Sequence, residues 1–262
     1  MDIEKLLGTA ANALSGAVNR NDEPAPQPSS RSTAIPIYTH EQIEAIVSHM
    51  TDSAVVSSNS PTNFSALEPT RKQAGTVEAF VKAMNESPSR IGQQRGQDAE
   101  KALLRLGETE GFLGMTPKNT PYFNLKEGRY IYTKKGGWID MVHFLFYAGR
   151  AYKYKQEGEK NPIGEAVQDG YLQERFDPAH SSYSYEDLPS DKFGADFAIN
   201  YFNANSNLTL GEQVERYLKE KLEATDPKDA PNYDSLPEDD SKNAPSRTNR
   251  TTKPVYTQEN PQ

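Results

Sequence analysis

Four polar side chains lie along one side of a predicted helix that is otherwise rich in apolar residues. The stretch 136–155, GGWIDMVHFLFYAGRAYKYK, contains the Trp, Phe, Leu, Met and Tyr residues expected of a helix buried in a core. At about 100° per residue, Asp140, His143, Tyr147 and Arg150 gather on the side opposite the apolar face. This polar stripe is the first place where we expect chemistry.

The spacing within the stripe favours acid–base chemistry. Asp140 lies three residues before His143, and Tyr147 lies four residues after it, so the three side chains are neighbours on a helix. His143 would be the general acid or base, Asp140 would orient it, and Tyr147 or Arg150 would hold a substrate anion. An equally simple alternative is that the stripe faces water, or that Asp140 caps the helix and His143 bonds a nearby carbonyl.

A second segment with dense functional groups follows downstream. The loop 180–191, HSSYSYEDLPSD, leads into a predicted helix and carries His180, Tyr185, Glu186 and Asp187. Such loops over a scaffold are common at functional sites, although Asp187 could instead cap the following helix. We therefore expect a pocket between the helix 136–155 and this loop. Its predicted catalytic residues are Asp140, His143, Glu186 and Asp187, and its predicted substrate-binding residues are Tyr147, Arg150, His180 and Tyr185.

Metal and cofactor motifs are weak. His143, His180, Glu186 and Asp187 are ligand types, but the sequence has no HExxH motif and no calcium-binding loop, so no metal ligand is assigned. It has no Gly-rich phosphate loop and no Gly-x-Ser-x-Gly motif, and the cofactor remains unknown. The absence of cysteine excludes thiolate nucleophiles and Cys-ligated zinc.

Composition limits the classes of partner. A formal net charge of −8 argues against a general nucleic-acid-binding protein, which needs a dense cationic surface. No apolar run approaches the roughly 20 residues that span a bilayer, so no transmembrane segment is expected. The N-terminus has an acid at its second position and no cationic segment before its apolar residues, which disfavours a classical signal peptide.

The apolar residues are concentrated in one part of the chain. We expect a main helical domain over residues 75–224, where Thr209 and Glu212 have the spacing of a capping box and GRYIYTKKGGW predicts a short strand or hairpin. Val142, Leu145 and Trp138 should belong to the core of this domain. Outside it, composition predicts an amphipathic helix (1–19), a flexible linker (20–37), a short helix (38–51), a second flexible linker (52–74) and a disordered tail (225–262).

Two stretches, GGWIDMVHF and YSYEDLPSDKFGADF, resemble segments of uncharacterised bacterial effector or cargo domains, including those of contractile injection systems. The resemblance covers about a quarter of the chain and assigns no role to any residue. It implies a protein made in the cytoplasm and delivered outside the cell by secretion or injection machinery, which would be its protein partner.

The sequence therefore predicts a mainly α protein with a single compact helical domain, one short strand or hairpin and disordered ends. Its expected function is that of a bacterial effector or cargo protein with hydrolase activity. The alternative is a non-catalytic cargo or structural interaction protein of a secretion assembly. Convergence of Asp140 or His143 with Glu186 or Asp187 in a cleft would favour the enzyme, and exposure of both segments to open solvent would favour the interaction protein.

Overall fold

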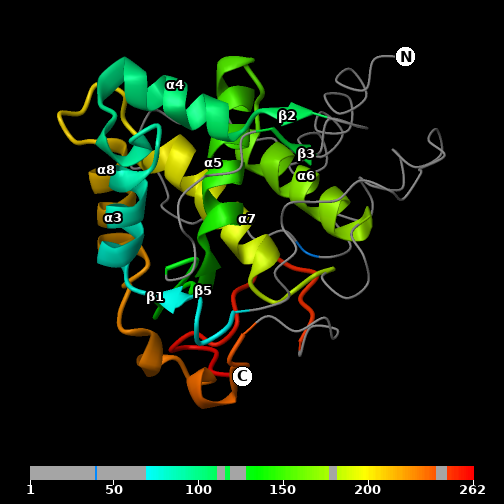
Figure 1. Cartoon of the computed structure of the whole chain (residues 1–262). Coiled ribbons are helices and arrows are strands. Elements are labelled where there is room, and N and C mark those ends of the chain that lie inside the picture. The colour runs from blue at the N-terminus through cyan, green and yellow to red at the C-terminus, as the bar shows by residue number, and fades with distance from the viewer. Residues whose placement is uncertain (1–38, 40–68, 111–115, 119–127, 177–181, 240–246) are drawn as a thin grey trace, which may run out of the picture.

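A long buried helix, α5 (Met141–Gln156), forms the centre of the molecule (Figure 1). The computed structural model describes residue 39 and residues 69–110, 116–118, 128–176, 182–239 and 247–262. Within this part the chain is mainly helical, as predicted, and it has a small three-stranded sheet where one short strand or hairpin was predicted. The predicted helix at 1–19, linker at 20–37 and short helix at 38–51 lie outside the described residues, apart from residue 39.

Helices that precede and follow α5 in the chain surround it. α4 (Gly96–Leu106), α6 (Pro162–Phe176) and α7 (Asp187–Asp196) all pack against it. α7 approaches closely because Gly194 lacks a side chain, and a Cβ there would lie 2.0 Å from the Phe144 carbonyl oxygen. This close contact positions the polar residues of α7 opposite those of α5.

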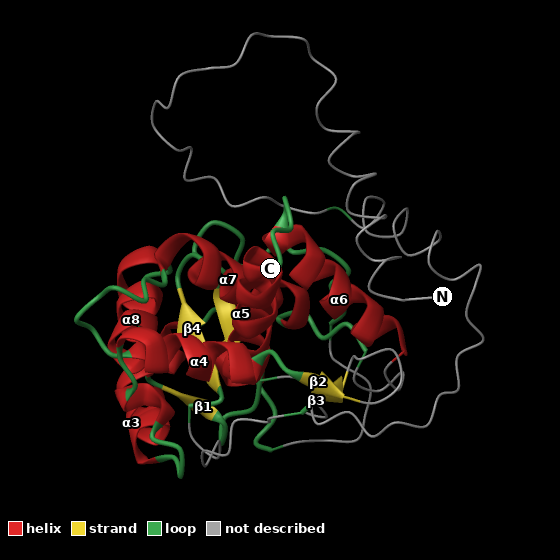
Figure 2. Ribbon diagram, turned by 90° about the horizontal axis from the view of Figure 1, so that it is seen from above, coloured by secondary structure: helices red, strands yellow, loops and turns green. Residues whose placement is uncertain are grey.

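The remaining helices extend the core at one end of the molecule (Figure 2). α3 (Val77–Glu86) packs against α8 (Leu210–Arg216), and α8 continues into a π-helical turn, η4 (Tyr217–Lys221). The capping box predicted for Thr209 and Glu212 is present at the start of α8. A second π-helical turn, η3 (Phe197–Tyr201), extends α7, and η1 (Ile91–Gln93), η5 (Pro227–Asp229) and η6 (Tyr233–Ser235) are short 3-10 turns.

The small sheet leads directly into α5. β1 (Ala74–Gly75) pairs in parallel with β4 (Tyr130–Thr133), which pairs in antiparallel fashion with β5 (Gly137–Asp140). The predicted hairpin is thus confirmed, and its register places Tyr130 opposite Asp140. A separate two-stranded ribbon joins β2 (Thr109–Glu110) to β3 (Thr116–Pro117).

The hairpin corrects the predicted helix start. Residues 137–140 form β5, and the helix begins only at Met141, because the Asp140 side chain caps it. Val142 and Leu145 lie in the main core as predicted. Trp138 lies instead in a second cluster with Tyr130, Tyr132 and Tyr185, since it belongs to the strand and not to the helix. No helix among the described residues is both long enough and apolar enough to cross a membrane.

Parts of the flanks are more ordered than composition indicates. Residues 69–74, predicted to be linker, lead into β1, and Thr70 is 1% exposed. Residues 225–239 and 247–262 of the predicted disordered tail also pack on the domain, burying Leu236 and Val255. Their polar residues bond to the backbone, as Asn249 does to the carbonyls of Tyr185 and Lys253, so order there requires few apolar residues.

Candidate functional site

Asp140 lies where β5 ends and α5 begins, and both of its carboxylate oxygens are engaged. Its Oδ1 accepts hydrogen bonds from the backbone N–H of Val142 at 2.8 Å and of His143 at 3.4 Å, which is the capping role raised as an alternative above. Its Oδ2 accepts two hydrogen bonds from the Arg129 guanidinium, at 3.1 and 2.8 Å. Burial alone would raise the pKa of Asp140, but the charge of Arg129 holds it below its ordinary value. Asp140 is therefore an ionised anchor for the start of α5.

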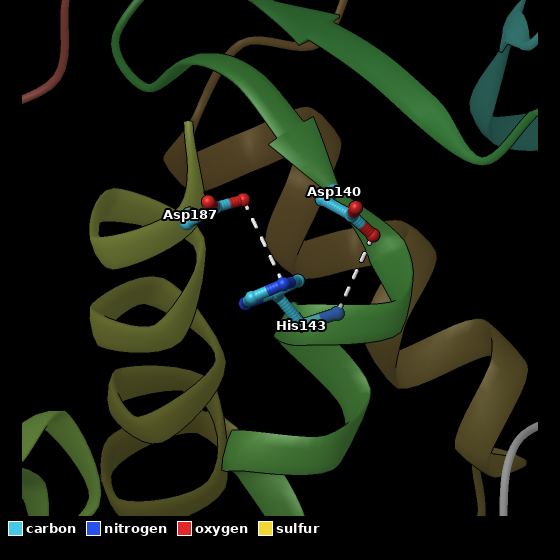
Figure 3. Close-up of side chains that lie close together, drawn as sticks. All are labelled: Asp140, His143 and Asp187. Carbon is cyan, nitrogen blue, oxygen red and sulfur yellow. Dashed lines mark hydrogen bonds and ion pairs between the residues drawn. The ribbon is translucent and has the colours of Figure 1, made fainter. Parts of the chain in front are cut away.

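His143 lies in the first turn of α5 and faces α7 (Figure 3). Its Nδ1 is 2.8 Å from Asp191 Oδ1, a hydrogen bond, and its Nε2 is 3.6 Å from Asp187 Oδ1. Asp187 and Asp191 are one helical turn apart, so α7 presents both carboxyl groups on the same face. The histidine is 2% exposed, and both acids are buried.

The surrounding carboxylates keep the imidazole protonated. Burial alone would lower the pKa of His143, but the charge of Asp191 and its hydrogen bond raise the pKa to about 9. Burial raises the pKa of Asp191 to about 6, although the charge of His143 opposes this change. At neutral pH the two residues therefore form a buried ion pair.

Two neighbouring carboxyl groups hold protons instead. Burial, with the charges of Glu174 and Glu186, raises the pKa of Asp187 well above its usual range. Burial and the charge of Asp140 raise the pKa of Glu186 to about 8. The cluster thus contains ionised and protonated groups side by side at neutral pH, a combination typical of acid–base sites.

A hydroxyl group connects the two sides of the cluster. Ser190 Oγ accepts a hydrogen bond from the Asp140 backbone N–H at 2.9 Å and donates one to the Glu186 carbonyl at 2.6 Å. Glu186 Oε2 accepts a hydrogen bond from Ser184, whereas, among the described residues, Glu186 Oε1 and the Tyr130 hydroxyl are buried without a hydrogen-bond partner. Buried polar atoms of this kind are costly, and they mark places where a bound molecule could restore the missing contacts.

The structure brings only part of the predicted site together. Asp140, His143 and Asp187 converge, and Glu186 is close enough for its charge to act on Asp140 and His143. The polar stripe does not face water, because Tyr147 is 1% exposed and Arg150 is 7% exposed. The alternative expected His143 to bond a nearby carbonyl, whereas its Nδ1 bonds the carboxylate of Asp191.

The predicted substrate-binding residues that the structure describes are bonded to groups outside the expected pocket. The Tyr147 hydroxyl donates to Gln173 Oε1 at 2.7 Å, and its ring centroid is 6.0 Å from that of His143. Arg150 pairs with Asp169 and Tyr154 in a separate buried cluster. Tyr185 packs in the second core cluster and accepts a hydrogen bond from Asn232. His180 lies outside the described residues.

Three partners of the cluster were not among the predicted site residues: Arg129, Glu174 and Asp191. Asp191 could have been found from its spacing, because it follows Asp187 by four residues and shares its helix face. Arg129 precedes the strand that pairs with β5, so a hairpin register would have placed it near Asp140. Glu174 lies near the C-terminal end of α6, and nothing local distinguishes it.

A cation could be considered at this cluster, because one ligand atom each of Asp140, His143 and Asp187 lie within 4.8 Å of one another. However, Asp140 is already held by Arg129 and by the helix N-terminus. Only His143 Nε2 and Asp187 then remain of the three, fewer than the ligands that a structural or catalytic zinc takes from a protein. The contacts therefore fit proton transfer better than metal binding.

Comparison of the chain with protein-family models, with curated proteins and with solved structures gave no match.

Proposed function

We propose that the protein is a hydrolase whose reacting group is His143, acting with Asp187 and held in place by Asp191. One observation carries the proposal: three side chains from two helices converge in a buried cluster, with His143 Nδ1 bonded to Asp191 and Nε2 facing Asp187. Burying several carboxyl groups around one histidine costs stability, so their convergence is more readily explained by chemistry than by structure.

Under this proposal, each of the three residues has its own part in the reaction. Asp191 fixes the tautomer by accepting the Nδ1–H, which makes Nε2 the nitrogen that exchanges a proton with water. The separation of 3.6 Å between Nε2 and Asp187 Oδ1 is longer than a hydrogen bond, so the two atoms are neighbours that are not hydrogen-bonded to each other. His143 is protonated at neutral pH, and the fraction in which it is neutral grows as pH approaches 9. In that neutral form Nε2 would take a proton from the attacking water, and protonated Asp187 would give one to the leaving group.

The test compares the full chain with His143→Gln and Asp191→Asn on chromogenic esters, glycosides and phosphates. Loss of His143 should lower the rate on the accepted substrate by about 100-fold or more, the usual contribution of a general acid or base. Lys155→Ala, which changes an exposed residue of the same helix, is the matched control. Equal rates for all variants on every substrate accepted by the unchanged protein would show that His143 is not catalytic.

The alternative function is that of a non-catalytic cargo or interaction protein, and one observation favours it. The side chains of Asp140, His143, Glu186, Asp187 and Asp191 are all buried, with Glu186 only 1% exposed, as in a structural ion-pair network. Under this alternative, His143→Gln would lower the melting temperature without changing any enzymatic rate. Delivery by secretion or injection machinery stays a prediction from the sequence resemblance, and recovery of the protein in the medium of its producing cells would test it.

A further inference from the structure

The C-terminal segment 247–262 lies along the loop that supplies part of the candidate site. Ser184 and Thr248 form an antiparallel bridge, and the Asn249 backbone N–H donates to the Tyr183 carbonyl at 3.0 Å. The Asn249 side chain donates to the Tyr185 carbonyl at 3.2 Å. The segment therefore adds backbone contacts along one edge of the loop 182–186.

Three further contacts fix the segment to the elements on either side of this loop. On α7, the buried Lys192 ammonium donates to the Thr252 carbonyl at 3.0 Å. On the hairpin, the Val255 carbonyl oxygen occupies the space beside Gly137, where a Cβ would lie 2.1 Å from it. Gln258 then donates its backbone N–H to the Lys134 carbonyl. In Figure 1 this red segment runs beside the end of the sheet that carries β5.

The opposite side of the same loop faces the His143 cluster. The Tyr183 backbone N–H donates to Glu174 Oε2, and the Ser184 hydroxyl donates to Glu186 Oε2 at 2.9 Å. The loop thus lies between the C-terminal segment and the buried carboxyl groups. Displacement of the segment would remove the bonds that hold the outer edge of the loop.

The bonding of the segment is suited to release. Most of its contacts are single hydrogen bonds, each of which contributes little net free energy because water can replace the partner. Val255 is the only aliphatic residue of the segment that is buried, and the partly buried Tyr256 ring packs edge-on against Tyr185, so the apolar contact that anchors the segment comes mainly from two side chains. Segments of this kind open locally without unfolding the rest of a domain.

We propose that residues 247–262 act as a strap that keeps the loop 182–186 closed over the His143 cluster, and that release of the strap opens the cluster to substrate. The proposal that strap release admits substrate rests on the proposed hydrolase function. The proposal that the strap keeps the loop closed does not. The strap would explain how a site whose side chains are all buried admits a substrate.

The experiment measures amide hydrogen exchange in the full-length chain. Val255→Asp introduces a charge into a buried position and should displace the strap, while Lys253→Ala changes an exposed side chain of the same segment and is the control. The amides of Tyr183 and Asp187 should exchange at least about tenfold faster in Val255→Asp, as expected when one or two net hydrogen bonds are lost. The amides of α4 should be unchanged, as should those of the loop in the control.

A milder variant, Asn249→Ala, removes four side-chain hydrogen bonds, of which only the one to the Tyr185 carbonyl reaches the loop, and it should accelerate the same amides to a smaller extent. Faster exchange of the strap alone, with a protected loop, would overturn the proposal. So would equal acceleration in α4, because the segment would then be part of the cooperative core. Faster exchange of the loop without hydrolysis of any substrate would preserve the strap and count against the hydrolase.

Discussion

His143 Nδ1 lies 2.8 Å from Asp191 Oδ1, and this hydrogen bond links the two helices that carry the candidate site. α5 supplies the imidazole and α7 supplies the carboxylate, and both groups are buried. A charged hydrogen bond in such surroundings is stronger than one at the surface, and losing either partner leaves a buried charge uncompensated. The properties of His143 should therefore depend directly on Asp191.

Asp191→Asn should lower the pKa of His143 from its value of about 9. The substitution removes the negative charge that favours the imidazolium and leaves only a neutral amide oxygen as acceptor, while burial continues to favour the neutral ring. NMR titration of the His143 ring protons would measure the change, with Asp196→Asn, a replacement elsewhere on α7, as the control. A pKa that stays near 9 in Asp191→Asn would mean that other groups set the charge of His143.

Stability should fall as pH rises from about 5 to about 8. The pKa of Glu186 is raised from 4.5 to about 8, so the folded state binds this proton more tightly than the unfolded state does. Its contribution is fully present below pH 4.5 and is lost as pH rises to about 8. The contribution of His143 is present below pH 6.5 and is lost as pH rises to about 9, which adds to the same trend.

Thermal melts across this pH range would test the trend, and Glu186→Gln should flatten it, because glutamine does not titrate. Lys192 acts in the opposite sense only at higher pH, since burial lowers its pKa to about 8. A melting temperature that rises steadily between pH 5 and pH 8 would contradict the assignment of these protons.

Tyr130→Phe should stabilise the protein by about 1 kcal/mol, because it removes a buried hydroxyl that has no hydrogen-bond partner among the described residues. Tyr147→Phe is the matched comparison, since the Tyr147 hydroxyl donates to Gln173 and its loss should destabilise by a similar amount. Chemical denaturation would measure both changes. Destabilisation by Tyr130→Phe would show that its hydroxyl is engaged in the folded protein.

Leu145→Ala should destabilise the protein by roughly 2–5 kcal/mol, since Leu145 is fully buried in the main core. Leu104→Ala on α4 should cost less, because Leu104 is only partly buried against the same core. Urea unfolding of both variants would test the assignment. Equal losses of stability would indicate that Leu145 contributes no more to packing than Leu104 does.

Local patterns in the sequence predicted the helices and strands better than they predicted the contacts between them. The capping box at Thr209, the hairpin before α5 and the apolar helix itself follow from spacing and residue type, because these features act over a few residues. The contact between His143 and Asp191 depends on how α7 packs against α5, and that packing depends on features such as Gly194. No short stretch of sequence contains this information.

The polar stripe illustrates the same limit. Its residues do share a region of α5, but α4, α6 and α7 enclose the helix, so a polar face does not imply exposure. The C-terminal tail shows the converse, because its composition indicates disorder while Asn249, Thr252 and Val255 have specific partners. Composition measures the average tendency of a segment to bury surface, and a few well-placed hydrogen bonds can override it.

Gly170→Ala should disturb the His143 cluster from the side of α6. A Cβ at Gly170 would lie 2.1 Å from Asp191 Oδ2, so the carboxylate would have to rotate away from its position. Overpacking of this kind typically costs about 1–3 kcal/mol, and here it should also lower the pKa of His143 by weakening its bond to Asp191.

A double-mutant cycle with Asp191→Ala would separate the contact between the two side chains from other effects of the added methyl group. Once Asp191 is truncated, the clash is absent, so Gly170→Ala should cost little stability and should leave the pKa of His143 unchanged. A full cost of Gly170→Ala in the Asp191→Ala background would place the clash elsewhere, for example against the Tyr147 ring, whose Cζ would lie 3.3 Å from the added methyl group.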